Sequence, residues 1–203
     1  MAKVRNQKFV TPHFRVSYPA LFEPDAPEGQ EKKYGVCMLF PKDTDISALK
    51  EAAKKAAINR WGPDMSDWPK PLRSPFRDGD KDKPDSPEYA GMVFVNARNK
   101  RRPGLVDGKK KPILDRDEMY AGCWARAELV AFAYDKAGNR GVAFALNHVQ
   151  KVGDDDAFDG RGKAEDAFDA IEGADDVTSS EVAVDDLFDE GTASPSDDDS
   201  LFD

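Results

Sequence analysis

Hydrophobic and polar residues alternate over several short stretches of this chain, as they do in β-strands with one buried face. In residues 9–18, polar residues separate the apolar side chains of Val10, Phe14, Val16 and Tyr18. Pro12 lacks a backbone donor and indicates an edge or a bulge within this run. Residues 34–40 are almost continuously apolar, as in a central strand, and the Pro- and acid-rich residues 19–31 predict a loop. Two strands are therefore expected before residue 45.

A different period follows in residues 46–61, where Ala and Leu are frequent and apolar positions recur every three or four residues. Asp45 precedes this stretch as a capping residue, and Gly62-Pro63 ends it. The pattern predicts one helix that packs on the body. Its outer face carries Lys50, Lys54 and Lys55, which fit a solvated helix surface as well as a ligand contact.

Three further strands are predicted in the second half of the body, at residues 89–98, 123–134 and 141–149. Residues 123–134 alternate between small side chains and larger ones, and a turn containing Gly and Asn leads into the last strand. The small face suits a tightly curved barrel wall. The other face, with Trp124 and Arg126, is either a second core layer or a binding platform. We expect a mainly β fold, an OB-fold-like five-stranded barrel with one helix.

Charge divides the chain into two parts. Residues 1–151 carry 28 Lys and Arg against 20 Asp and Glu, a net of +8, whereas residues 152–203 carry 2 against 19, a net of −17. The second part shows no sustained period, so we expect one folded domain over 1–151 and a disordered acidic tail over 152–203. A basic body attracts phosphate polymers, and a tethered acidic tail competes with them for the same surface.

The predicted tail repeats a motif in which an apolar residue precedes Phe and Asp. The copies are Ala157-Phe158-Asp159, Ala167-Phe168-Asp169, Leu187-Phe188-Asp189 and Leu201-Phe202-Asp203. An aromatic ring among carboxylates is physically similar to an unpaired nucleic-acid strand, which also combines negative charge with a flat stacking face. A solubility tail with inert Phe residues is the alternative.

Basic and aromatic residues gather near the ends of the predicted strands and in the proline-rich loop 62–87. Four cations lie among residues 98–102, and charge packed so densely is self-repulsive unless a polyanion relieves it. The loop adds an aromatic and basic mix suited to stacking and phosphate contact. The candidate contacts are Arg15, Trp68, Phe76, Arg77, Tyr89, Arg98, Lys100, Arg101, Arg102, Lys109, Lys110, Lys111, Trp124 and Arg126.

This combination favours a protein that binds single-stranded nucleic acid. Stacking on aromatic rings contributes about 1–3 kcal/mol per base whatever the sequence, and OB-fold barrels combine it with a cationic groove. A reader of duplex DNA more often has a recognition helix or a zinc module, and neither is evident in this sequence.

Two other functions stay open at this point. A metal-dependent nuclease would use carboxylates, although the available ones lie in predicted loops without an orienting His; they are Asp78, Asp80, Asp82, Asp115 and Asp117. An acidic-tailed chaperone or DNA mimic would bind a protein partner instead of nucleic acid. Because no catalytic cluster is evident, we expect a binding protein and not an enzyme.

Cysteine and histidine are too few and too scattered to form a zinc site. Cys37 and Cys123 lie in apolar runs, and the two histidines are His13 and His148. We therefore expect buried free thiols, no metal and no cofactor. No apolar stretch approaches the roughly 20 residues that span a bilayer, and the N-terminus lacks the apolar block of a secretory signal. These features predict a protein of the reducing cytoplasm without a membrane partner.

Four runs resemble a family of tailed-phage single-stranded DNA-binding proteins, long described as a domain of unknown function. They are PEYAGMVFVNAR (87–98), RRPGLVD (101–107), MYAGCWARAELVAFAY (119–134) and GVAFALNHVQKV (141–152). The resemblance covers about residues 6–152 and is strongest after Pro87. It implies an OB-fold body that coats single-stranded DNA during phage replication and recombination in an infected bacterium. The predicted helix follows the second strand, earlier than usual in an OB fold, so either a strand is miscounted or the first run is split.

The same resemblance implies that the acidic tail contacts replication or recombination proteins and competes with DNA. The tail residues in question are Phe188, Asp198, Asp199, Leu201, Phe202 and Asp203. Phe202 is next to last where the family pattern ends on Phe, which leaves the role of a terminal carboxylate open. Association of two copies into a homodimer also stays open.

Overall fold

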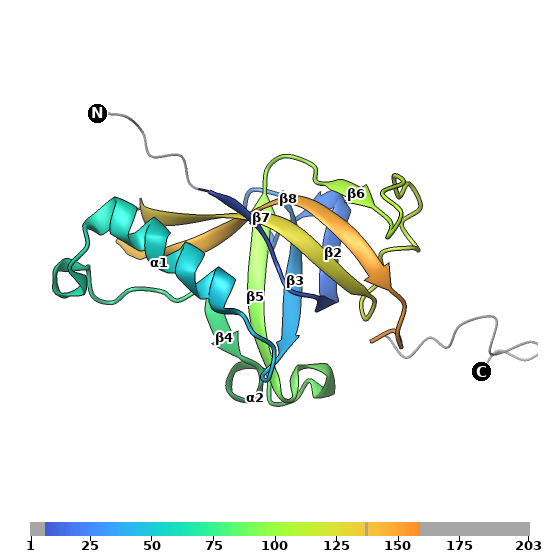
Figure 1. Ribbon diagram of the computed structural model, residues 1–203, viewed down its shortest axis with the longest axis horizontal. Coiled ribbons are helices and arrows are strands. Elements are labelled where there is room, and N and C mark those ends of the chain that lie inside the picture. The colour runs from blue at the N-terminus through green and yellow to red at the C-terminus, as the bar shows by residue number, and fades with distance from the viewer. Residues whose placement is uncertain (1–6, 137, 159–203) are drawn as a thin grey trace, which may run out of the picture. The chain divides into compact units, whose positions relative to one another are not determined.

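The computed structural model describes residues 7–136 and 138–158 of the chain (Figure 1). They lie within one unit, Met1–Gly162. The second unit, Lys163–Asp203, falls outside the described residues, and so do the last three copies of the Phe-Asp motif. Of the predicted tail, the structure therefore describes only residues 152–158.

Five strands, paired mostly antiparallel, close into a ring, which confirms the predicted mainly β barrel. The order around the ring is β7-β2-β3-β5-β8, and β8 pairs back onto β7. The only parallel contact inside this ring joins β5 to β8 at Ala97 and Phe144. The ring strands are β2 (Phe14–Asp25), β3 (Lys33–Pro41), β5 (Met92–Asn99), β7 (Trp124–Lys136) and β8 (Asn139–Gly153).

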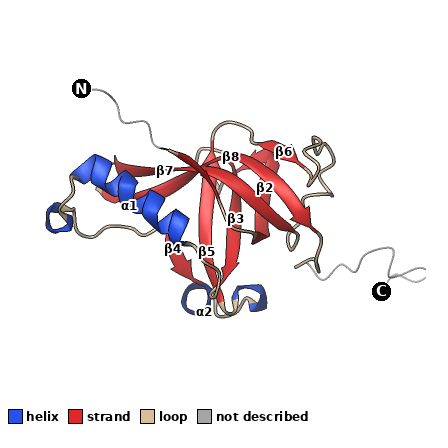
Figure 2. Ribbon diagram, viewed as in Figure 1, coloured by secondary structure: helices blue, strands red, loops and turns tan. Residues whose placement is uncertain are grey.

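Three short strands extend the ring at its edges, and one long helix lies beside it (Figure 2). The strands are β1 (Lys8–Val10) on β7, β4 (Phe76–Asp78) on β5 and β6 (Gly104–Val106) on β8. The long helix is α1 (Ser47–Trp61), and the short helical turns are η1 (Met65–Asp67), α2 (Gly79–Asp82) and η2 (Pro87–Tyr89). No helix in the part of the chain that the structure describes is long and apolar enough to cross a membrane.

The helix is where the sequence predicted it, because its apolar stripe packs on the ring. Its buried side chains are Leu49, Ala53, Ala56 and Ala57, and it contacts β7 and β8. At its start the carboxylate of Asp45 accepts a hydrogen bond from the Ser47 amide at 2.9 Å. Three strands, β1 to β3, precede the helix along the chain, because the first predicted run is split.

The first predicted strand is two strands, and the break falls at Pro12, where an edge or a bulge was expected. β1 ends at Val10 and β2 begins at Phe14, and the two pair with different parts of β7. The predicted loop over 19–31 was wrong for its first residues, because β2 continues to Asp25 and buries Leu21 in the core. Tyr18 was predicted on the inner face of this strand, but it is 66% exposed.

Small residues on one face of β7 form the curved wall of the barrel, as expected. Ala125, Ala127 and Ala131 are buried, and larger side chains from the facing strands fill the interior. Both cysteines are buried free thiols. Burial raises the pKa of the Cys123 thiol to about 11 and also raises the pKa of the Cys37 thiol.

Candidate nucleic-acid interface

One row of residues crosses the outer face of the sheet, from β7 over β2 and β3 to β5 and β4. The strand register places each member opposite the next, in the order Trp124, Arg15, Leu39, Phe94 and Arg77. Residues directly opposite one another in antiparallel strands share a face of the sheet. Their neighbours along the strands point into the barrel core. We call these five residues the cross-strand row.

Two pairs of an arginine and an aromatic ring lie along the cross-strand row, with Leu39 between the pairs. The guanidinium carbon of Arg15 lies 5.6 Å from the centre of the Trp124 ring, and that of Arg77 lies 4.9 Å from the centre of the Phe94 ring. Arg77 also pairs with Asp82 at 3.0 Å. A guanidinium on a ring is held flat while its donors stay available to a phosphate. Leu39 and Phe94 are buried, so the accessible part of the cross-strand row offers the Trp124 ring for stacking and the Arg15 and Arg77 guanidinium groups as phosphate donors.

Residues 154–158, which belong to the predicted tail and follow β8, contact Arg15 and Trp124 of the cross-strand row. The Asp155 carboxylate pairs with Arg15 at 2.9 Å and accepts a hydrogen bond from the Trp124 indole at 2.8 Å. Arg15 also donates to the Asp156 carbonyl at 2.7 Å, and the Phe158 ring centre is 4.8 Å from its guanidinium carbon. We call residues 154–158 the covering segment.

Glycine at position 122 makes room for the covering segment. Gly122 has a φ of 114°, and a Cβ there would lie 2.2 Å from the Asp156 carbonyl oxygen. Phe158 packs against a small buried cluster outside the barrel, and its backbone amide donates to the Ala121 carbonyl at 3.0 Å. The expectation of disorder from residue 152 onward is therefore wrong for residues 152–158. The first two of them end β8, and Asp154, Asp155, Asp156 and Phe158 have hydrogen-bond partners on the barrel. The first copy of the Phe-Asp motif, which contains Phe158, is the sequence feature from which the contact of this segment with the barrel could have been predicted.

Tyr89, predicted as a base-stacking residue, belongs instead to a buried cluster that also contains Leu39 and Phe94 of the cross-strand row. It is 1% exposed, and its ring packs edge-on against Phe94. Its hydroxyl is 3.0 Å from the Ser17 hydroxyl and donates to the Cys37 sulfur at 3.5 Å. Burial raises the pKa of this hydroxyl. A buried Tyr uses its polar end in this way to satisfy a hydrogen bond inside the fold.

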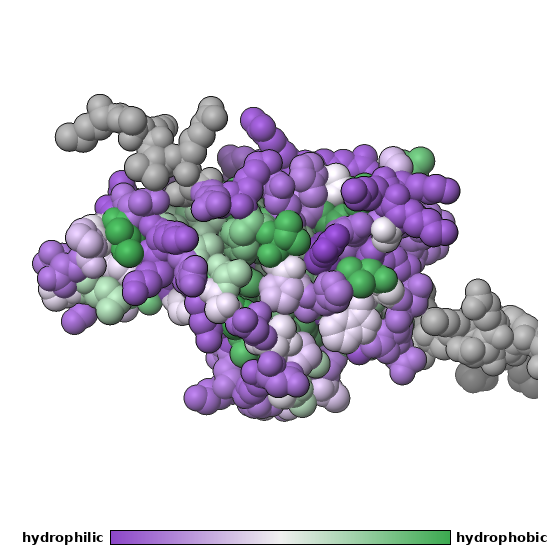
Figure 3. All heavy atoms as spheres, in the orientation of Figure 1, coloured by the Kyte–Doolittle hydropathy of each residue, from purple (hydrophilic) through white to green (hydrophobic). Residues whose placement is uncertain are grey.

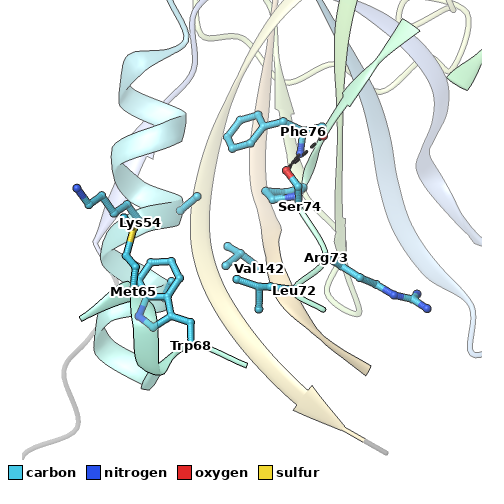
Figure 4. A pocket seen from close by; sticks show the side chains of 11 residues that line it. Lys54, Met65, Trp68, Leu72, Arg73, Ser74, Phe76 and Val142 are labelled. Carbon is cyan, nitrogen blue, oxygen red and sulfur yellow. Dashed lines mark hydrogen bonds between the residues drawn. The ribbon is translucent and has the colours of Figure 1, made fainter. Parts of the chain in front are cut away.

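Trp68 and Phe76, also predicted to stack bases, lie in a groove beside α1 (Figure 4). Phe76 neighbours Arg77 but points the opposite way, and its ring is 6.0 Å from that of Phe144 in the core. Trp68 packs against Trp61 and donates its indole hydrogen to the Gly62 carbonyl at 3.0 Å. The groove has a volume of about 300 Å³ and mostly apolar walls. The structure does not bring these two rings to the cross-strand row.

Arg98 extends the cationic surface along β5, on the same face as Phe94. Opposite it on β3 is Gly35, where a Cβ would lie 2.8 Å from the Arg98 side chain. The missing side chain at Gly35 therefore gives the Arg98 stem space over β3. Beyond the end of β5, Lys100 pairs with Glu31, and the guanidinium of Arg102 lies 5.8 Å from the Phe22 ring. Arg101 is exposed in the same turn.

Arg126 and the lysine loop form a second basic group, connected by hydrogen bonds. Arg126 donates to Gln150 at 2.8 Å, and Gln150 donates to the Asp107 carbonyl at 2.9 Å. The Asp107 carboxylate in turn accepts hydrogen bonds from the backbone amides of Lys109 and Lys111. Lys109, Lys110 and Lys111 are all exposed. In Figure 3, strongly hydrophilic side chains gather over β6 and the loop that follows it.

The acids considered for metal chemistry are held in local ion pairs and turns. Asp78 and Asp80 contact the Lys42 ammonium at 2.9 and 2.6 Å, and this lysine lowers the pKa of both carboxyls. Asp115 accepts a hydrogen bond from the Asp117 amide. Among the described residues, no three His, Cys, Asp or Glu side chains are grouped as a metal site requires.

The predicted tail contacts lie outside the described residues. They are Phe188, Asp198, Asp199, Leu201, Phe202 and Asp203.

Comparison with known proteins gives consistent results. The model of the family described as the single-stranded DNA-binding protein of Enterobacter phage Enc34 matches residues 7–178. Putative protein p50 of Acyrthosiphon pisum secondary endosymbiont phage 1 is 36% identical over 179 residues, which are 82% of this chain and 92% of that protein.

Solved structures with the same fold come from two phages. The single-stranded DNA-binding protein of bacteriophage Enc34, in complex with single-stranded DNA, superposes with a TM-score of 0.66 and 28% identity over 74% of this chain and 89% of that one. The single-stranded DNA-binding protein gp2.5 of bacteriophage T7 gives a TM-score of 0.57 and 16% identity over 83% of this chain and 97% of that one. The second similarity concerns the fold alone.

Proposed function

The chain belongs to the family of the Enterobacter phage Enc34 single-stranded DNA-binding protein, and from this we propose that it binds single-stranded DNA across the cross-strand row. The observation that carries the proposal is the register of that row, which sets the half-buried Trp124 ring beside Arg15 and the exposed Arg77 over the buried Phe94 ring. Every base has a flat face and every nucleotide a phosphate, so such a surface binds without regard to sequence. A duplex hides its base faces in the stack and presents fewer of these contacts.

Aromatic and basic residues have different tasks in DNA binding. Trp124 stacks a base, while the guanidinium forks of Arg15, Arg77 and Arg98 contact phosphates. Arg126 and the lysine loop, together with the turn after β5, continue the phosphate path on either side. The residues of this extension are Lys100, Arg101, Arg102, Lys109, Lys110 and Lys111.

Fluorescence anisotropy with labelled oligonucleotides tests the proposed function. Single-stranded DNA is expected to bind more tightly than duplex of the same length. The affinity should fall with salt, with a log–log slope of about −0.7 per phosphate neutralised. Tighter binding to duplex than to single strands, or an affinity that salt leaves unchanged, would contradict the proposal.

We also infer that the covering segment competes with DNA for the cross-strand row. The Asp155 carboxylate contacts Arg15 where a phosphate would, and the Phe158 ring meets the same guanidinium as a base would. Tethering keeps this competitor at high effective concentration until a strand displaces it. The further Phe-Asp motifs of the tail reinforce the competition and, once displaced, recruit proteins of phage replication or recombination. While it is bound to the cross-strand row, the single-stranded DNA is protected.

Removing one carboxylate of the covering segment should strengthen DNA binding. We expect Asp155→Asn to raise the affinity for a single strand about two- to five-fold at low salt, the range for a partly exposed ion pair. The matched control is Asp156→Asn, which removes the same charge but touches Arg15 only through its backbone carbonyl. Equal affinities of the two variants would show that general charge, and not occupation of Arg15, sets the competition.

We propose binding and not catalysis as the activity of this chain. The carboxylates best placed for a metal-dependent nuclease, Asp78 and Asp80, are engaged by Lys42. Single-stranded DNA incubated with the protein and magnesium is therefore expected to remain uncut.

A further inference from the structure

Tyr18 interrupts the alternation of β2. In a regular strand its side chain would share the inner face with Phe14 and Val16, both of which are 0% exposed. Tyr18 has a φ of 44° instead, and its side chain is 66% exposed. The left-handed backbone conformation therefore turns an inward position outward and leaves a large aromatic ring in solvent.

This conformation is unfavourable for a tyrosine, and the neighbouring contacts hold it in place. The Ser17 hydroxyl is hydrogen-bonded to the buried Tyr89 hydroxyl at 3.0 Å, and Pro19 follows directly. The β2–β3 register shifts between Ser17 and Ala20, so Tyr18 sits in a bulge. Glycine would form such a bulge without strain and without an exposed ring. Strain of this kind is concentrated at positions that contact ligands.

A cation lies beside the exposed ring. The Lys83 ammonium, at the end of α2, is 5.9 Å from the centre of the Tyr18 ring and 5.9 Å from that of the Tyr89 ring. Lys83 belongs to the connection between β4 and β5, which are the strands of Arg77 and Phe94. Tyr18 is three residues from Arg15 on β2, a distance of about 10 Å along a strand. The pair therefore repeats, next to the cross-strand row, the combination of ring and cation found within it.

From these contacts we infer that Tyr18 and Lys83 form a nucleotide subsite in which one unpaired base stacks on the Tyr18 ring and its phosphate pairs with Lys83. The inference rests on the proposed function and deepens it, since it names a further contact of the same strand. The bulge has a direct role here because it presents the ring to the base.

Tyr18→Gly separates this role from a structural one. Glycine adopts a positive φ freely, so the midpoint of thermal unfolding should stay unchanged or rise. The affinity for fluorescent oligothymidylate should nevertheless fall about 5- to 150-fold, as for loss of one stacked base. Tyr18→Phe keeps the ring and should bind like the unchanged chain. An oligonucleotide carrying 2-aminopurine should lose stacking-dependent quenching with Tyr18→Gly and keep it with Tyr18→Phe.

The lysine is tested through the salt dependence. Lys83→Gln should reduce the log–log slope by about 0.7, which corresponds to one phosphate. Lys81→Gln is the matched control, since Lys81 is an exposed lysine two residues earlier on α2. If the two variants have equal log–log slopes of affinity against salt, Lys83 does not contact a phosphate and is not part of the subsite.

The outcomes distinguish this inference from the function on which it rests. If the unchanged full chain fails to bind oligothymidylate at low salt, the proposed function itself fails. If it binds and Tyr18→Gly binds equally well, the subsite is wrong while the function stands. If Tyr18→Gly loses affinity only in step with a lower unfolding midpoint, Tyr18 has a structural role and the inference is overturned.

Discussion

Replacing Trp124 by alanine is expected to weaken single-stranded DNA binding by about 1–3 kcal/mol, a loss of roughly 5- to 150-fold. Trp124 is the first residue of β7, and its half-buried indole lies beside Arg15 on the outer face. A base that stacks there also places its phosphate near that guanidinium. Alanine removes the stacking face and leaves the charge, so the affinity should fall while the salt slope changes little.

Intrinsic fluorescence provides the measurement and its control. The chain has three tryptophans, and the other two, Trp61 and Trp68, pack against each other beside the groove at the end of α1. The quenching of tryptophan fluorescence by single-stranded DNA should therefore disappear in the Trp124→Phe variant and persist in the Trp68→Phe variant. The opposite result would move the binding surface to the groove and refute the assignment of the cross-strand row.

Replacing Phe144 by alanine should lower the free energy of unfolding by about 3–5 kcal/mol. Phe144 is 1% exposed, and its ring lies between those of Phe9 and Phe76, at 5.9 and 6.0 Å. Phe144 also lies where β5 and β8 pair to close the barrel, opposite Ala97 on β5 and Ala131 on β7. Because these two neighbours are alanines, their side chains cannot fill the cavity left by the lost ring.

Denaturant unfolding monitored by circular dichroism measures this loss. Val130→Ala serves as the control, because Val130 is a half-buried residue on the outer face of β7 and should give a much smaller effect. The folded fraction of Phe144→Ala should bind DNA like the unchanged chain, since this ring faces away from the cross-strand row. If Phe144→Ala lowers the free energy of unfolding no more than Val130→Ala does, the barrel does not depend on the Phe144 side chain for its stability.

Local periodicity was enough to predict most of the barrel. The alternation of small and large residues in 123–134 identified β7 and its inner wall, and the stripe of Leu49, Ala53 and Ala57 identified the packed face of α1. Pro12 indicated an edge or a bulge in the first strand, and the structure interrupts the strand at this point, because a missing backbone donor acts locally. These features depend on residues close in sequence, so a single sequence carries them.

The candidate site was only partly predictable, because an aromatic residue in a loop or at the end of a predicted strand has no period to show which way it faces. Tyr89 and Phe76 carry the same ring chemistry as Trp124, yet they are packed inside the fold. Arg15 and Trp124 were both named from the sequence, but not as neighbours. Tyr18 was missed because the alternation places it on the buried face.

By itself the sequence determined the five ring strands, the long helix and the separation of a basic body from an acidic tail, since each follows from the period or composition of neighbouring residues. Only the tertiary structure decided which side chains share a surface. Arg15 meets Trp124 and the covering segment through strand register and backbone turns that connect positions 107 to 141 residues apart. Such pairing is set by the packing of the whole barrel, and no local pattern encodes it.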